Sequence, residues 1–276
     1  MIKNFKTKHG DVPVEIINTK FRETPKTTYK FRIWSNQNHQ KILSKQELWI
    51  PSPSTFNDPF DCRINVAYHL MAKDEKLARE FFTRLVSKNP KSFPPEQKEQ
   101  YIEQALKDAH FKDDEWLDDH NETTIKQSHE ILGVYCLSPT YNNAMMWSHY
   151  ADGHRGFCVG FDMEKLCPYF SGGGFVTYSD KYPIISPIEE EDKKYFMPLV
   201  LKSDHWDYEV EYRLLKMGVV NQAIPIDKSI IKEVVLGCLM EKEHKKEIIE
   251  LVSSQLPHVK ILQAKKQRDT FDITFS

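Results

Sequence analysis

Alternation of apolar and polar residues marks the strand-forming parts of this chain. In the segment YKFRIW, Tyr29, Phe31 and Ile33 form an apolar face, while Lys30 and Arg32 lie on the opposite face, which is typical of a half-buried strand. Segments of comparable character recur in the middle and near the end of the chain. We therefore predict strands near residues 29–34, 47–50, 132–138, 157–162, 209–216 and 233–237.

A different pattern occupies residues 71–130. This stretch is strongly charged, and Leu77, Phe81, Phe82 and Leu85 recur in it at helical spacing. The pattern predicts a helical insert packed on the outside of the main domain. A lid and a layer of helices over one face of a sheet both fit it, and the covering layer is favoured.

The chain ends with the segments IIKEVVLGC, EKEHKKEIIELVSSQL and HVKILQAKK. They alternate strand, helix and strand, the order of a βαβ unit. Strand-type segments also stand on both sides of the helical block. The sequence therefore predicts one α+β domain over residues 1–276, with a mixed or split β-sheet, a helical insert and a C-terminal strand-helix-strand unit.

The segment MMWSHYADGHRGFCVGFD is typical of a short helix, a turn and a strand. Asn143, Trp147, Tyr150 and His154 share one face at helical spacing. These side chains could form a pocket wall or an aromatic core at a helix-strand corner, and both interpretations stay open. The SGGGF segment that follows predicts a flexible turn.

Composition excludes several classes of protein. The 276 residues are 40% hydrophobic and 28% charged, with a net charge of -2, so nothing drives the whole chain towards nucleic acid or a membrane surface. No apolar run could span a bilayer and no signal peptide is present, so we expect a cytoplasmic protein. The five cysteines are scattered without CxxC spacing, and no metal site is predicted.

Candidate chemistry lies in the segment YEVEYRLLKM. If it is a strand, Glu209, Glu211 and Arg213 share one face, and Val210 and Tyr212 share the other. Two neighbouring carboxylates suit general-base work or the stabilisation of a developing cation. An exposed strand face with an incidental ion pair is the ordinary alternative for an isolated ExE.

Two other polar groups carry weaker signals. Arg32 could bind phosphate through two hydrogen bonds, although a lone arginine on a strand is more often a surface residue. In the loop PSPSTFNDPFDC, Asp58 and Asp61 are expected to fix the turns of the loop. The GxGxxG, GxxxxGK[ST], HExxH and GxSxG motifs are absent, which argues against four large enzyme classes.

The segments FNDPFD, CLS, MMWSHYADGHRGFCVGFD, WDYEVEYRLL and VVLG together resemble a widespread family of uncharacterised bacterial proteins. The resemblance covers roughly residues 29–240, with the helical insert as the variable part. It implies membership of a family but no function.

The order of elements also resembles the ADP-ribosyltransferase fold. The matching order is YKFR with Arg32, then QKILSKQELWIPS, then GVYCLS with the helix NNAMMWSHYA, then GFCVGFD, and finally Glu211 within YEVEYRLL. The chain has no STS motif, only Ser138 at the end of CLS, and no HG dipeptide after the first strand.

This second resemblance implies NAD as a co-substrate. It makes Glu211 the carboxylate that stabilises an oxocarbenium-like transition state, and Glu209 the residue that orients the acceptor. The implied cofactor-binding residues are Arg32, Ser138, Trp147, Tyr150 and His154.

Three functions therefore remain open from sequence. The first is an NAD-consuming transferase, a class that includes toxins and anti-phage effectors. The second is a ligand-binding or regulatory module on the same fold. The third is a nucleic-acid-processing protein, against which the missing basic excess counts. The acceptor, a macromolecule or a small molecule, and the oligomeric state cannot be read from the sequence.

Overall fold

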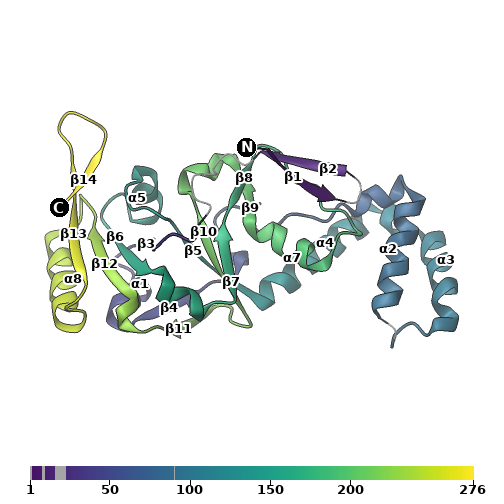
Figure 1. The fold of residues 1–276 in the computed structure, drawn as a ribbon, viewed down its shortest axis with the longest axis horizontal. Helices are drawn as coiled ribbons and strands as arrows, with labels where there is room; N and C mark the ends of the chain where they lie inside the picture. The colour runs from purple at the N-terminus through teal and green to yellow at the C-terminus, as the bar shows by residue number, and fades with distance from the viewer. Residues whose placement is uncertain (1, 8–9, 16–22, 90) are drawn as a thin grey trace.

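The computed structural model describes residues 2–7, 10–15, 23–89 and 91–276. The molecule is elongated, with sheets in the middle and at one end and helices at the other (Figure 1). In chain order the strands are β1 Ile2–Thr7, β2 Gly10–Glu15, β3 Thr27–Arg32, β4 Glu47–Ile50, β5 Leu132–Leu137, β6 Phe157–Asp162, β7 Gly172–Phe175, β8 Thr177–Ser179, β9 Leu201–Ser203, β10 Tyr212–Met217, β11 Gln222–Pro225, β12 Ile231–Leu236, β13 Lys260–Lys266 and β14 Ile273–Phe275. The α-helices are α1 Gln37–Ser44, α2 Glu75–Lys88, α3 Lys98–Asp108, α4 Asp114–Ile131, α5 Ala144–Tyr150, α6 Met163–Leu166, α7 Glu191–Val200 and α8 Lys242–Gln255. The predicted α+β class is confirmed.

The largest sheet has the strand order β14-β13-β12-β6-β3. Strands β12 and β13 are parallel, and their neighbours are antiparallel, so the sheet is mixed. Helix α8 connects the two parallel strands and buries Ile248 and Val252 in the main core. The C-terminal strand-helix-strand unit therefore forms as predicted, because a parallel pair needs a crossover connection.

A second sheet, β5-β10-β7, meets the first at a single bridge among the described residues. Tyr29 in β3 and Ser138 after β5 exchange two backbone hydrogen bonds, of 2.7 and 2.9 Å. The sheet is therefore split as predicted, and the side chains of β3 and β5 beyond the bridge border a common space.

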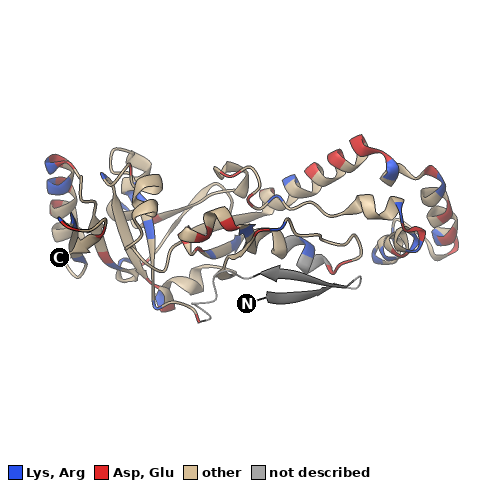
Figure 2. Ribbon diagram, turned by 90° about the horizontal axis from the view of Figure 1, so that it is seen from above, with Lys and Arg blue, Asp and Glu red and all other residues tan. Residues whose placement is uncertain are grey.

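The predicted helical insert is present as α2, α3 and α4. Leu77 and Val86 of α2, Ile102 of α3 and Phe111 belong to a hydrophobic cluster separate from the main core. Helices α2 and α3 form the far end of the molecule instead of covering a sheet face, and Figure 2 shows many of the charged residues on these helices and on α8 at the opposite end. No helix in the described part of the chain is long and apolar enough to cross a membrane.

The strand predicted for residues 209–216 begins later than expected. Residues Asp204–Glu209 form a 3₁₀ helix whose first turn is capped by the Ser203 side chain, and Val210 adopts a left-handed conformation with φ 46°. Strand β10 starts only at Tyr212. Glu209 and Glu211 therefore both precede the strand, and the predicted strand alternation of Glu209, Glu211 and Arg213 is wrong for its first two members.

The SGGGF segment is also different from the predicted turn. Its residues form strand β7, which pairs with β10. A Cβ atom on Gly173 would lie 2.5 Å from the backbone oxygen of Arg213. The glycine permits this close approach, so β7 pairs with the part of β10 that contains Arg213, a residue of the site described below.

Candidate functional site

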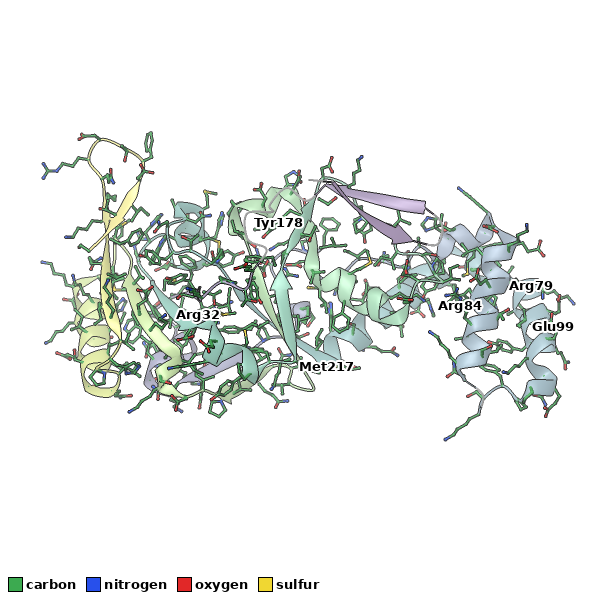
Figure 3. The ribbon with its side chains drawn as sticks, in the orientation of Figure 1. Arg32, Arg79, Arg84, Glu99, Tyr178 and Met217 are labelled. Carbon is green, nitrogen blue, oxygen red and sulfur yellow. The ribbon has the colours of Figure 1, made fainter. Side chains whose placement is uncertain are left out.

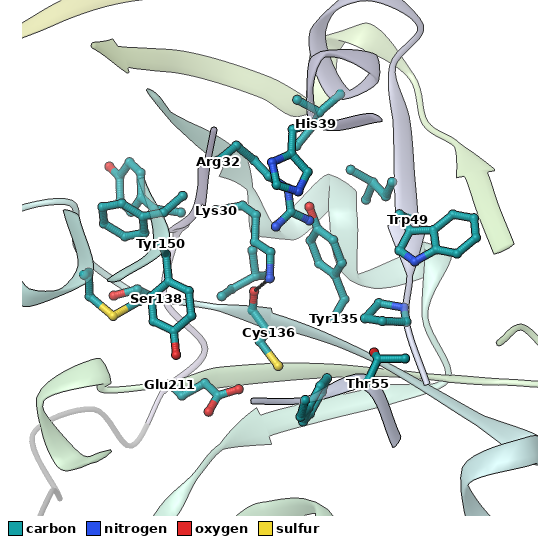
Figure 4. Close-up of a pocket in the computed structure, with 18 of the residues that line it drawn as sticks. Lys30, Arg32, His39, Trp49, Thr55, Tyr135, Cys136, Ser138, Tyr150 and Glu211 are labelled. Atoms are coloured by element: carbon teal, nitrogen blue, oxygen red, sulfur yellow. Dashed lines mark hydrogen bonds between the residues drawn. The ribbon is translucent and has the colours of Figure 1, made fainter. Parts of the chain in front are cut away.

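A pocket of about 960 Å³ opens where β3 and β5 separate (Figure 4). Its wall combines β3, β5, α5, β4 and the FNDPFD loop with the end of the Asp204–Glu209 helix. The volume lies near the upper end of the range for small-molecule sites. Segments far apart in sequence thus contribute to one cavity.

One wall of the pocket is cationic. Lys30 and Arg32 both line it from β3, and neither has a carboxylate partner among the described residues. Lys30 donates a 2.7 Å hydrogen bond to the backbone oxygen of Cys136. Burial and the neighbouring Arg32 lower the pKa of Lys30 to about 8. Two adjacent cations without an acidic partner favour an anionic ligand.

Neutral polar groups complete this wall. The Tyr135 hydroxyl is buried and has no hydrogen-bond partner among the described residues. His39 accepts a 3.2 Å hydrogen bond at Nδ1 from the Ile33 amide. Burial, with Arg32 nearby, lowers the pKa of His39 to about 4, so its imidazole is neutral at pH 7. An unsatisfied buried hydroxyl is costly, and a ligand oxygen could satisfy it.

The opposite part of the pocket contains a buried cluster of charges. Arg213 donates from Nε and Nη2 to the two carboxylate oxygens of Glu211, at 2.9 and 3.0 Å, and from Nη2 to Asp61 at 2.7 Å. Lys202 donates to Glu209 at 2.6 Å and lies 3.3 Å from Glu211 and 3.4 Å from Asp61. We call these five residues the charge cluster. It holds three carboxylates and two cations.

The two glutamates of the charge cluster have opposite pKa shifts. Burial alone would raise the pKa of Glu211, but Arg213 and Lys202 outweigh burial and hold that pKa well below its usual range. Burial and the charge on Glu211 raise the pKa of Glu209, against the effect of Lys202. Glu211 is thus held in its ionised form at neutral pH, and Glu209 is the member that takes up a proton more readily.

Two tyrosines fix the positions of these glutamates. The Tyr150 hydroxyl, at the end of α5, donates a 2.6 Å hydrogen bond to Glu209. The fully buried Tyr178 hydroxyl in β8 accepts the backbone N–H of Glu211 at 2.9 Å. The Asn143 side chain also holds the backbone oxygen of Tyr208, so α5 is tied to the segment that carries Glu209.

The structure brings together most of the site residues predicted from sequence. Those that line the pocket are Arg32, Ser138, Tyr150, Glu209 and Glu211. Their predicted ligand contacts stay predictions.

The predicted convergence is wrong for Trp147 and His154, neither of which lines the pocket. Trp147 is fully buried and packs edge-to-face on Phe31, with its ring centroid 5.1 Å away, while its indole nitrogen donates to the Tyr141 backbone oxygen. His154 lies beyond the end of α5 with a φ of 69°, because the chain turns through left-handed residues there. The aromatic-core interpretation therefore fits these two side chains.

Sequence reasoning missed several residues of the site. Lys202 belongs to no recognisable motif. It lies in β9, and it joins the site because its ammonium group pairs with Glu209 at the end of the Asp204–Glu209 helix. Asp61 accepts the Cys62 thiol within its own loop at 3.4 Å, but it also binds Arg213, a contact that the loop-fixing prediction did not include. Asp58 does fix the loop, since its side chain accepts the Phe60 amide at 2.9 Å. The FNDPFD motif was the one available signal for Asp61.

The pocket is chemically bipolar. Lys30 and Arg32 suit a phosphate or carboxylate, and the excess carboxylate of the charge cluster suits a positive group. No group of three metal-ligating side chains lies together in the described part of the chain. The arrangement can bind a ligand that carries both charges, and it can stabilise positive charge that develops near Glu211.

The comparison with known proteins supports the first of the two sequence resemblances. A family model described as "Protein of unknown function (DUF2971)" matches residues 146–214, so a domain of this uncharacterised family is found there. The matched range runs from α5 to β10 and includes Tyr150, Tyr178, Lys202, Glu209 and Glu211. No curated protein and no solved structure matches the chain.

Proposed function

We propose that the pocket binds NAD and that the protein transfers or hydrolyses its ADP-ribose, with Glu211 as the essential carboxylate. The observation that carries this proposal is the bipolar pocket. NAD has a diphosphate for the wall of Lys30 and Arg32 and a positively charged nicotinamide ring for the side of the charge cluster. The split sheet, with carboxylates before β10 and an arginine facing the pocket from β3, also fits the ADP-ribosyltransferase-like order of elements.

The chemistry gives the two glutamates different roles, and both begin the step as carboxylates. The bond between ribose C1′ and the nicotinamide nitrogen breaks, and its electron pair leaves with nicotinamide. Glu211 is ionised and stabilises the oxocarbenium-like state. The acceptor oxygen, or water, bonds to C1′ and gives its proton to Glu209, whose raised pKa suits a general base.

The decisive experiment measures nicotinamide release and NAD affinity separately. Glu211→Gln should lower turnover by about a hundredfold or more, while NAD affinity changes much less. Glu130→Gln, at an exposed glutamate of α4, is the matched control and should leave both quantities unchanged. Because the neutral amide of the Glu211→Gln variant would bind Arg213 less strongly, circular dichroism and thermal unfolding must show that the variant is folded.

A second substitution separates transfer from hydrolysis. Glu209→Gln should reduce transfer to an acceptor more than it reduces NAD hydrolysis, because water is small and needs less orientation. Cell extract serves as the source of acceptors. If the wild type releases no nicotinamide with any extract, the transferase proposal is wrong.

One observation favours a second candidate, a non-catalytic ligand-binding module with the same pocket. Both carboxylate oxygens of Glu211 already accept hydrogen bonds from Arg213, which leaves less capacity for a ribose hydroxyl. This candidate predicts that NAD or ADP-ribose binds in calorimetry without turnover. Binding with turnover would exclude it.

A further inference from the structure

Trp49 is an unusual residue on the rim of the pocket. Strand β4 alternates, with Leu48 and Ile50 fully inside the main core and Trp49 on the opposite face, where 50% of it is exposed. Its neighbour across the β4–β11 pair is Ala223, and both line the pocket. The small side chain of Ala223 leaves the indole face uncovered.

The other tryptophans of the described chain have partners. Trp34 and Trp147 each donate a hydrogen bond from the indole nitrogen, to Glu247 and to the backbone oxygen of Tyr141. Trp116 stacks on His120, and Trp206 packs near Tyr208. Among the described residues Trp49 has neither a ring contact nor a hydrogen bond at its indole nitrogen. Its ring is therefore available to a ligand.

The position of Trp49 relative to the charged walls decides what that ligand could be. In Figure 4, Lys30 and Arg32 lie between Tyr150 on one side and Trp49 on the other, and Glu211 lies below Tyr150. A ligand whose phosphates lie at Arg32 would thus place one end near the carboxylates and the other near the indole. A flat aromatic base fits an uncovered indole, because base–aromatic stacking is favourable for every base.

We propose that Trp49 is the stacking platform for the base of a dinucleotide, so that the pocket selects NAD over nicotinamide mononucleotide. The diphosphate lies at Lys30 and Arg32, and the second nucleoside lies towards Tyr150 and the charge cluster. This inference rests on the proposed function for the identity of the second nucleoside. The base platform itself stands on the exposure of Trp49 and its place in the pocket.

The test compares NAD with nicotinamide mononucleotide, which has the same scissile bond but lacks the AMP half with its base. Trp49→Ala should raise KM for NAD about tenfold and leave KM for nicotinamide mononucleotide unchanged. Trp49→Phe should keep the wild-type preference, because phenylalanine retains an aromatic face. Trp49→Leu should lose it, because leucine keeps apolar bulk without that face. Trp116→Phe, in the helical insert, is the control and should change KM for neither substrate.

A binding experiment separates the failure of this inference from the failure of the proposed function. ADP has the base and the diphosphate but no nicotinamide, and its affinity is measured by calorimetry on the wild type and on Trp49→Ala. If ADP binds the wild type about tenfold more tightly than the variant while NAD is not turned over, the platform stands and the transferase proposal fails. If Trp49→Ala binds ADP and turns over NAD as the wild type does, the platform is wrong and the transferase proposal stands.

Discussion

Arginine–carboxylate pairs occur in two contrasting regions of this molecule. In the charge cluster, Arg213 is 0% exposed and its partner Glu211 5%. In the helical insert, Arg79 of α2 binds Glu99 of α3 at 2.7 Å, with 42% and 72% of their side chains exposed. Figure 3 shows Arg79 and Glu99 at the end of the molecule away from the pocket, which includes Arg32. Both regions contain an arginine–glutamate ion pair, but the two pairs differ in their exposure to solvent.

The contrast between these two regions shows that exposed and buried ion pairs have different consequences for stability. An exposed pair is screened by water and salt, so it adds little to stability. A buried pair gains little over an apolar replacement, yet removing one partner leaves an uncompensated charge. The charge cluster is therefore weak evidence for stability and better evidence for a function that needs carboxylates in a fixed state beside a pocket.

The largest effect is expected for Arg213→Met. The substitution leaves Glu211 and Asp61 buried with Lys202 as their one remaining cation in the described chain, so the free energy of unfolding should fall by about 3–5 kcal/mol. Urea unfolding at pH 7 measures it. Combining it with Glu211→Leu removes one stranded carboxylate and should recover part of the loss. An unfolding free energy equal to that of the wild type would contradict the assignment of Arg213 to a buried network.

Arg32→Leu tests the opposite case, an arginine without an acidic partner. Because Arg32 makes no ion pair in the described chain, its removal should leave the free energy of unfolding unchanged or raise it. Affinity for ADP should fall about tenfold or more, since a charge-assisted hydrogen bond contributes about 1.5–3 kcal/mol. Calorimetry measures the affinity. Arg268→Leu, at an exposed arginine near the C-terminus, should change neither quantity.

The sequence predicts the strands of this fold better than it predicts the residues of the site. Local alternation predicts β4 and β6 with correct bounds, because the side chains of a half-buried or buried strand report their own environment. The same rule fails at Glu209, where the Ser203 cap and the left-handed Val210 override an alternating pattern. Helix capping and backbone conformation depend on neighbouring residues, and the alternation of apolar and polar residues carries no information about them.

The residues of the site are harder to predict than the strands, because they come together from distant parts of the chain. Arg32, Ser138, Tyr150, Glu209 and Glu211 were available from motif order, and they do line one pocket. Lys202 and Trp49 were not available, because neither residue type nor spacing states which side chain faces a cavity. The place of both side chains in the pocket depends on how distant segments come together around the split sheet, which only the assembled fold determines.

Lys30 supplies a pH-dependent test of the cationic wall. Its pKa falls from 10.5 to about 8 on folding, because burial and Arg32 disfavour the charged form. Between pH 8 and 10.5 the unfolded chain binds a proton that the folded chain has lost, so this residue makes stability rise with pH in that window. Below pH 8 both states are protonated, and the contribution is flat and unfavourable.

Lys30→Met should therefore have a higher Tm than the wild type at pH 7, and the difference should shrink from pH 8 to 10.5. Measuring Tm of both proteins by circular dichroism across this range cancels the titration of other groups. A constant difference at every pH would show that Lys30 titrates normally, and the cationic wall would then be more open to solvent than its burial indicates.

Arg79→Ala is expected to have the smallest effect of all. Arg79 contacts Glu99 and Glu103 on α3, but these side chains are well exposed, so the loss of attraction is offset by better hydration and regained side-chain freedom. Tm should change far less than in Arg213→Met, and what change there is should vanish in about 1 M salt, where the Debye length is about 3 Å. The Arg213→Met effect should persist in the same salt, because ions do not reach a buried cluster. A large, salt-resistant loss in Arg79→Ala would show that α2 and α3 depend on this pair, and the contrast between the two regions would then reflect packing and not solvent.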